Sequence, residues 1–115
     1  METLFTNSDE FETSLKEFEG IPELIPANSI IIRLNKKPIS LLCIYFDSQM
    51  AFVHGLYRSK NCNLREFSKS LKAIEENLTR FQKVAHLIFF TNLKAIKRRL
   101  IKANFKSEKT ELFYV

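Results

Sequence analysis

The change of hydrophobic period that decides the fold lies within residues 50–81, which read MAFVHGLYRSKNCNLREFSKSLKAIEENLTRF. Residues 50–57 are apolar at most positions, which is typical of a strand, and residues 58–63 are polar. Apolar residues then recur at spacings of three and four, at Leu64, Phe67, Leu71, Ile74, Leu78 and Phe81. This spacing predicts an amphipathic helix of about five turns, with Asn63 as its N-cap.

Two further strands precede this segment. Residues 29–34 form a β-branched run, and residues 39–46 are apolar at nearly every position. Short polar segments at 35–38 and 47–49 separate the three strands, so we expect an antiparallel meander. Because the middle strand is apolar on both of its faces, we expect both faces to be covered.

The N-terminal segment predicts a short strand over residues 1–6 and then a helix. Asn7 offers an N-cap and Glu10 stands three residues on, which is the capping-box pattern. An apolar stripe at helical spacing follows, made of Phe11, Leu15 and Phe18. Gly20 and Pro22 end this helix.

The C-terminal third predicts a strand over residues 85–90, a helix over 93–103 and a closing strand over 111–115. The element order is therefore β–α–β–β–β–α–β–α–β. We expect one α+β domain spanning residues 1–115, in which helices flank a mixed, mostly antiparallel sheet.

The composition is that of a folded globular chain. Of its 115 residues, 45% are hydrophobic and 27% are charged, which excludes the disordered and collagen-like classes. The longest uncharged stretches are far shorter than the ~20 apolar residues of a membrane-spanning helix. The acidic start lacks the basic region of a signal peptide, so we expect a cytoplasmic protein with reduced thiols. The two cysteines and two histidines have no zinc-site spacing, so no metal is expected.

The charge is divided unevenly along the chain. Residues 1–23 carry seven acidic side chains against one lysine, whereas the whole chain has a net charge of +5, so the remainder carries +11. Such a division predicts an acidic face and a basic face on one small body. It favours an anionic partner, which could be a nucleotide cofactor, a nucleic acid or an acidic protein.

The element order, with a meander feeding a long helix and then strand–helix–strand, resembles the GNAT superfamily of acyl-CoA-dependent N-acyltransferases. In that family a loop of pattern Gln/Arg-x-x-Gly-x-Gly/Ala opens the long helix, and its backbone N–H groups hold the acyl-CoA pyrophosphate. The matching stretch reads RSKNCN, with Asn61 and Asn63 where the family has small residues. The resemblance implies an acetyl-CoA or other acyl-CoA site formed by Arg58, Lys60, Asn61, Cys62, Asn63 and Leu64. The alternative interpretation of the loop is a plain polar helix cap.

A second stretch matches the family in part. The family often shows Asn-x-x-Ala, then a general-acid Tyr, then Gly-Phe. Here Asn92, Ala95 and Phe105 fit, but Arg99 and Leu100 stand where the Tyr would be. By resemblance Asn92 hydrogen-bonds the pantetheine arm, and its other interpretation is a helix N-cap. With a phosphate loop that lacks glycine, the chain is similar to short GNAT-like proteins encoded by tailed bacteriophages.

Acyl transfer of this class works mainly by holding amine and thioester together, aided by a base and an oxyanion donor. The candidate catalytic side chains are His54, Tyr57 and Glu66. A backbone N–H within residues 53–56 would stabilise the oxyanion. Gly55 there indicates a β-bulge, which the family uses to part its fourth and fifth strands. Ordinary structural roles are the alternatives, namely a solvent-facing His54, a packing Tyr57 and a regular strand at Gly55.

Basic side chains gather between residues 94 and 109. On a helix, Lys94, Lys97, Arg98 and Lys102 share the outward face. This face is either simply solvated or contacts a protein or a nucleic acid. The stretch therefore provides the candidate partner-binding residues.

Two functions of different classes follow. One is an N-acetyltransferase that uses acetyl-CoA. The other is a GNAT-like domain with a weakened acyl-CoA site that serves as a macromolecular interaction module, for example a phage protein that binds a host or virion partner. The loop without glycine and the missing Tyr favour the second, so we predict weak or undetectable acetyl-CoA binding.

Overall fold

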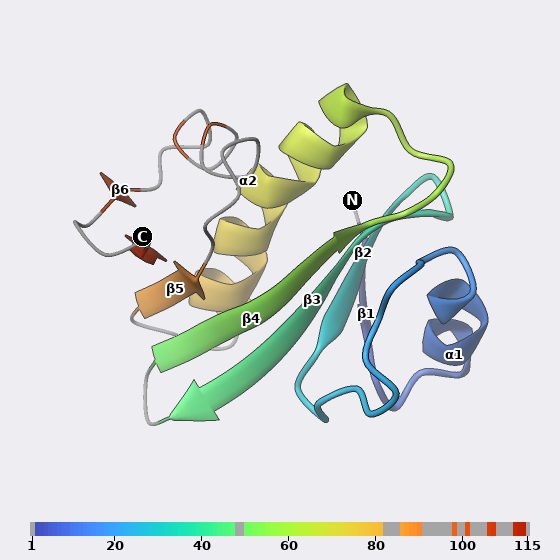
Figure 1. Ribbon diagram of the computed structural model, residues 1–115, viewed down its shortest axis with the longest axis horizontal. Helices are drawn as coiled ribbons and strands as arrows, with labels where there is room; N and C mark the ends of the chain where they lie inside the picture. Colours follow the sequence, from blue (N-terminus) through green and yellow to red (C-terminus); the bar gives the residue numbers. More distant parts are fainter. Residues whose placement is uncertain are drawn as a thin grey trace.

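A computed structural model gives the structure of residues 2–47, 50–81, 86–90, 98, 101, 106–107 and 112–114. In chain order its elements are β1 (Glu2–Phe5), α1 (Asp9–Leu15), β2 (Ile30–Leu34), β3 (Lys37–Asp47), β4 (Met50–Arg58), α2 (Leu64–Phe81), β5 (His86–Phe90), β6 (Lys106–Ser107) and β7 (Leu112–Tyr114). Figure 1 shows a strongly twisted sheet flanked by the two helices. The predicted α+β class is confirmed.

The strands form one sheet in the order β1-β2-β3-β4-β5-β7-β6. β4 and β5 pair in parallel, and the other neighbouring strands pair antiparallel. The prediction of a mixed, mostly antiparallel sheet is therefore confirmed. The two-residue strand β6 was not expected. The predicted helix over 93–103 lies outside the described residues, except that Arg98 and Ile101 are both helical and exposed.

The meander is confirmed, with a tighter first turn than the sequence predicts. Asn35 and Lys36 both have positive φ, 51° and 65°, and Leu34 pairs with Lys37. Two left-handed residues between antiparallel strands make the hairpin turn whose twist matches that of the strands. Pro38, read as part of the turn, belongs to β3 and pairs with Arg33 beside a bulge, where the ladder is interrupted.

The first helix differs from its prediction at both ends. Ser8, not Asn7, is the N-cap, and its side chain makes no capping hydrogen bond, so the predicted capping box is wrong. The helix ends at Leu15, yet Phe18 is still buried. The apolar stripe therefore indicated the buried residues correctly but extended the helix beyond its end.

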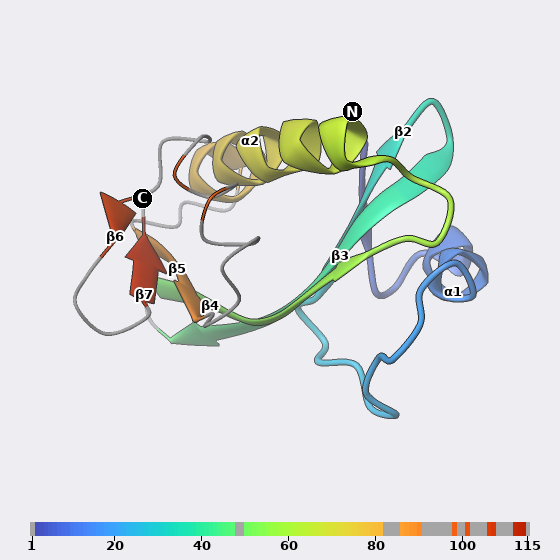
Figure 2. The same ribbon diagram turned by 45° about the horizontal axis from the view of Figure 1, so that its top comes forward.

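The core has one layer on each face of the sheet. α2 packs Phe67, Leu71 and Ile74 against one face, in a cluster that includes Ile30 and Phe89. α1 packs Phe11 against the other face, in a cluster with Leu4, Phe18, Ile31, Leu41 and Cys43. Figure 2 shows α2 lying along its side of the sheet. The prediction that both faces of the middle strand are covered is confirmed.

Candidate functional site

A β-bulge interrupts β4 in the segment that the sequence singled out. Cys43 pairs with Gly55 and Ile44 pairs with Val53, so His54 is the extra residue. The parallel pairing of β4 with β5 also ends at Val53. The predicted bulge is confirmed, and beyond it the described part of β4 pairs only with β3.

Gly55 makes room for the ring of Tyr57. A Cβ at Gly55 would stand 2.8 Å from Tyr57 Cε2 and 3.3 Å from Cys43 Cβ. Tyr57 packs against the α1-side cluster, and burial of its phenol raises its pKa, with a further rise from Cys43. The phenol therefore keeps its proton at neutral pH, which suits packing and a proton donor better than a base.

His54, the extra residue of the β4 bulge, contacts aromatic rings. Its exposed ring meets the ring of Tyr45 edge-on, with centroids 5.0 Å apart, and a tilted Phe52 ring lies 6.4 Å away. Glu66 instead contacts Lys37 and Asn63. The described contacts thus do not join the three candidate catalytic side chains into one group.

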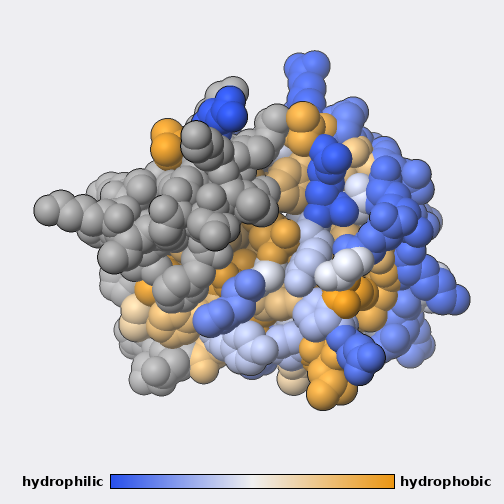
Figure 3. Space-filling view, viewed as in Figure 1, coloured by the Kyte–Doolittle hydropathy of each residue, from blue (hydrophilic) through white to orange (hydrophobic). Residues whose placement is uncertain are grey.

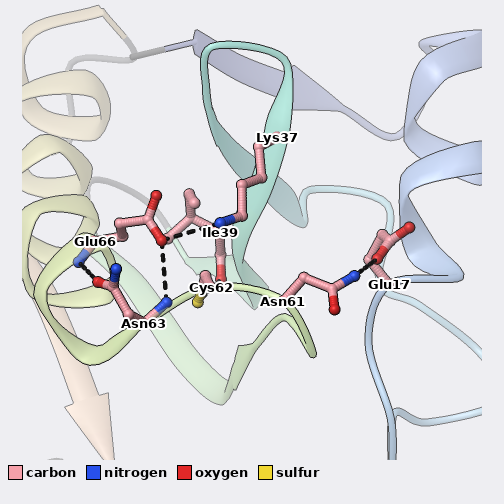
Figure 4. Close-up of polar contacts among 7 residues, drawn as sticks. All are labelled: Glu17, Lys37, Ile39, Asn61, Cys62, Asn63 and Glu66. Atoms are coloured by element: carbon pink, nitrogen blue, oxygen red, sulfur yellow. Dashed lines mark hydrogen bonds and ion pairs between the residues drawn. The ribbon is translucent and has the colours of Figure 1, made fainter.

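A reciprocal capping box closes the N-terminus of α2. The Asn63 N–H donates to Glu66 Oε1 at 3.0 Å, and the Glu66 N–H donates to Asn63 Oδ1 at 2.8 Å. Lys37 Nζ donates to the same carboxylate oxygen at 3.1 Å (Figure 4). The Asn63 N–H, followed by Lys37, lowers the pKa of Glu66, so its carboxylate is ionised at neutral pH. An anion belonging to the chain itself therefore occupies one backbone N–H of the loop.

The other half of the loop is fastened to the segment after α1. The Lys60 N–H donates to the Glu17 carbonyl at 2.8 Å, and Asn61 Nδ2 donates to the Glu17 carboxylate at 3.0 Å (Figure 4). Lys60 Nζ also lies 3.9 Å from a Glu19 carboxylate oxygen. These contacts direct the Asn61 amide to the Glu17 carboxylate and occupy the Lys60 backbone N–H with the Glu17 backbone carbonyl.

Cys62 belongs to the core and not to the surface of the loop. Its side chain is buried in the α2-side cluster, and Sγ donates to the Ile39 carbonyl at 3.5 Å. The Ser59 N–H donates to the same carbonyl at 3.0 Å. The Ile39 carbonyl oxygen can accept both hydrogen bonds because it has two lone pairs. The Cys62 side chain is therefore directed away from any ligand on the loop.

The remaining candidate residues lie as follows. Arg58, Lys60 and Leu64 are exposed, at the end of β4, in the loop and at the start of α2. Arg98 is exposed. The candidates outside the described residues are Asn92, Lys94, Lys97 and Lys102.

The loop region combines cations with carboxylates. Arg58 and Lys60 bring positive charge, whereas Glu17, Glu19 and Glu66 bring negative charge within contact of the loop. In Figure 3 the strongly hydrophilic colouring gathers over the side that carries α1, which fits the acidic N-terminal residues. Such a mixed field favours an incoming pyrophosphate less than a basic loop with bare N–H groups would.

Three partners of the loop were missed from the sequence. Lys37 and Glu17 stand 29 and 44 residues from their partners Glu66 and Asn61. Ile39 contributes only its carbonyl. A signal did exist for Glu66, because Asn63-Leu64-Arg65-Glu66 has the spacing of a capping box.

The described residues contain no group of three or more His, Cys, Asp and Glu side chains that could hold a metal ion. Neither described helix is long and apolar enough to cross a membrane. Comparison with protein-family models and with curated protein sequences gives no match to this chain.

Proposed function

We propose that the chain is a GNAT-like domain whose acyl-CoA loop is closed by its own side chains, and that it acts by binding a macromolecule. The carrying observation is the Glu66 carboxylate on the Asn63 N–H at the N-terminus of α2. A phosphate that used this N–H would displace a carboxylate held also by Lys37. Displacement removes the charge-assisted hydrogen bond that the carboxylate accepts from the Asn63 N–H and places the phosphate beside a like charge.

Other features support the fold on which this proposal rests. A meander runs into a loop and a long helix, and the next strand pairs in parallel with the last strand of the meander. The bulge in β4 lies where this pairing ends. The resemblance to the GNAT superfamily implies this arrangement. By the same resemblance, the macromolecule is a host or virion partner of a phage protein.

The two asparagines of the loop contribute to its closure in a specific way. Asn61 is held by Glu17 and Asn63 by the Glu66 N–H. We therefore attribute the closure mainly to the occupied N–H and the neighbouring carboxylates, and less to side-chain bulk.

Calorimetric titration with acetyl-CoA tests the closed loop. We expect no measurable heat from the unaltered protein and a gain of roughly ten- to a hundredfold in affinity from Glu66→Gln, which removes the competing charge but keeps a cap acceptor. Asn61→Gly with Asn63→Gly should add to this gain. The matched control is Glu12→Gln, an exposed acid on α1 that should leave binding unchanged.

The second candidate function is an acetyl-CoA-dependent N-acetyltransferase. The bulge at His54 favours it, since backbone N–H groups beyond the end of the β4–β5 pairing would be available to a thioester oxygen. Micromolar acetyl-CoA binding by the unaltered protein would contradict the closed loop. It would make the acetyltransferase the better proposal.

A further inference from the structure

The outward face of α2 carries a row of three cations. Arg65, Lys69 and Lys72 are all exposed and follow one another at spacings of four and three, so they share one side of the helix. The row spans roughly 10 Å along the axis. The next position in the series is Glu76, where the row ends.

Three other described basic residues are paired with carboxylates. Arg33 pairs with Glu2 and Glu10. Lys37 pairs with Glu66, and Lys60 pairs with Glu19. Arg65, Lys69 and Lys72 form no salt bridge within the part of the chain that is described. All three side chains are exposed to solvent, and Lys69 also lies close enough to Glu66 to lower the pKa of that carboxyl.

From this row we infer that α2 binds the phosphate backbone of a nucleic acid. The inference deepens the proposed function and rests on it, because it names the class of macromolecule. Apart from the cations, the side chains between Arg65 and Lys72 are either partly exposed, at Glu66 and Ser68, or buried. No exposed aromatic side chain lies among them. A protein partner would normally meet an apolar or aromatic centre, which this row lacks, whereas Lys and Arg are the usual contacts of phosphates.

Direct titration of nucleic acid tests the row. The probes are a labelled single strand of about 20 nucleotides and the duplex of the same sequence, followed by fluorescence anisotropy at several salt concentrations. Three phosphate contacts predict a slope of log K against log salt of roughly −2 for the single strand and roughly −3 for the duplex. The probe that binds more tightly, single strand or duplex, identifies the form of nucleic acid that α2 prefers.

The decisive variant is Arg65→Gln with Lys72→Gln. It spares Lys69, which lies close enough to favour the ionised Glu66. Loss of two contacts should lower single-strand affinity by roughly fifty-fold at about 50 mM salt and flatten the slope to about −0.7. The matched control is Lys16→Gln with Lys36→Gln, which removes the same charge from exposed positions outside α2 and should change affinity far less.

Three outcomes would overturn the inference. They are no binding by the unaltered protein at low salt, equal losses in the two double variants, or binding of poly-glutamate at the same α2 residues with higher affinity than either oligonucleotide. The last would assign the row to an acidic protein. None of them bears on acetyl-CoA binding, so failure here and failure of the closed loop are told apart by separate titrations.

Discussion

Tyr57 folds back over Gly55 on the same strand, and a methyl group at Gly55 would stand 2.8 Å from Tyr57 Cε2. We expect Gly55→Ala to lower the free energy of unfolding by about 1–3 kcal/mol, because the ring must leave its packed position. Urea denaturation measures the loss. In a Tyr57→Ala background the same change should cost much less, and an equal cost in both backgrounds would show that the ring is not the cause.

Asn63 is expected to be the chief capping residue of α2. Asn63→Ala should lower the free energy of unfolding by about 0.5–2 kcal/mol, because the Glu66 N–H loses its acceptor. Asn63→Ser keeps a capping oxygen and should retain most of the stability. Thermal unfolding compares the two variants, and equal melting temperatures would contradict the capping role.

The ionised form of Glu66 should stabilise the fold in a pH-dependent way. The pKa of Glu66 is lowered in the folded chain, so its contribution is present above the unfolded pKa and is lost as the pH falls through the folded one. We expect the unaltered protein to exceed Glu66→Gln in urea midpoint at pH 7. The difference should shrink as the pH falls below the ordinary glutamate pKa and vanish once the pH is below the lowered pKa of the folded chain. A difference that stays constant across this range would show that charge is not involved.

The α2-side core should be sensitive to truncation. Phe67 and Leu71 are 2% and 0% exposed, and either change to Ala should cost about 2–5 kcal/mol of unfolding free energy. Leu64 on the same helix is 49% exposed and serves as the control, for which Leu64→Ala should cost far less. Similar losses at all three positions, measured in urea, would contradict the assigned core.

The sequence predicted α2 closely because two local signals agreed. The apolar period began at Leu64 and an asparagine stood directly before it, and the helix spans Leu64–Phe81. The first helix was predicted less well. Phe18 is buried from an irregular segment, so hydrophobic spacing alone could not mark the end of α1 at Leu15.

The site was only partly readable from the sequence, for a physical reason. The bulge at Gly55 had a local signal, since glycine inside a strand pattern indicates one. The contact between Asn61 and Glu17 joins residues 44 positions apart in the sequence, so no local pattern could predict it. The cap role of Glu66 has a local signal in its spacing from Asn63, whereas its Lys37 partner depends on how β3 approaches α2.

We expect the parallel pairing of β4 with β5, the one such pairing among the described strands, to divide the folding of the chain into two stages. The β2–β3–β4 hairpins close through short turns, so their ladders form at a small entropic cost. β5 reaches β4 only after the whole of α2 has been traversed, which requires a much larger chain closure. We expect pulse-labelled hydrogen exchange to protect β3 before β5. A nascent chain emerging from the ribosome would then have formed the meander before the second half of its sheet exists.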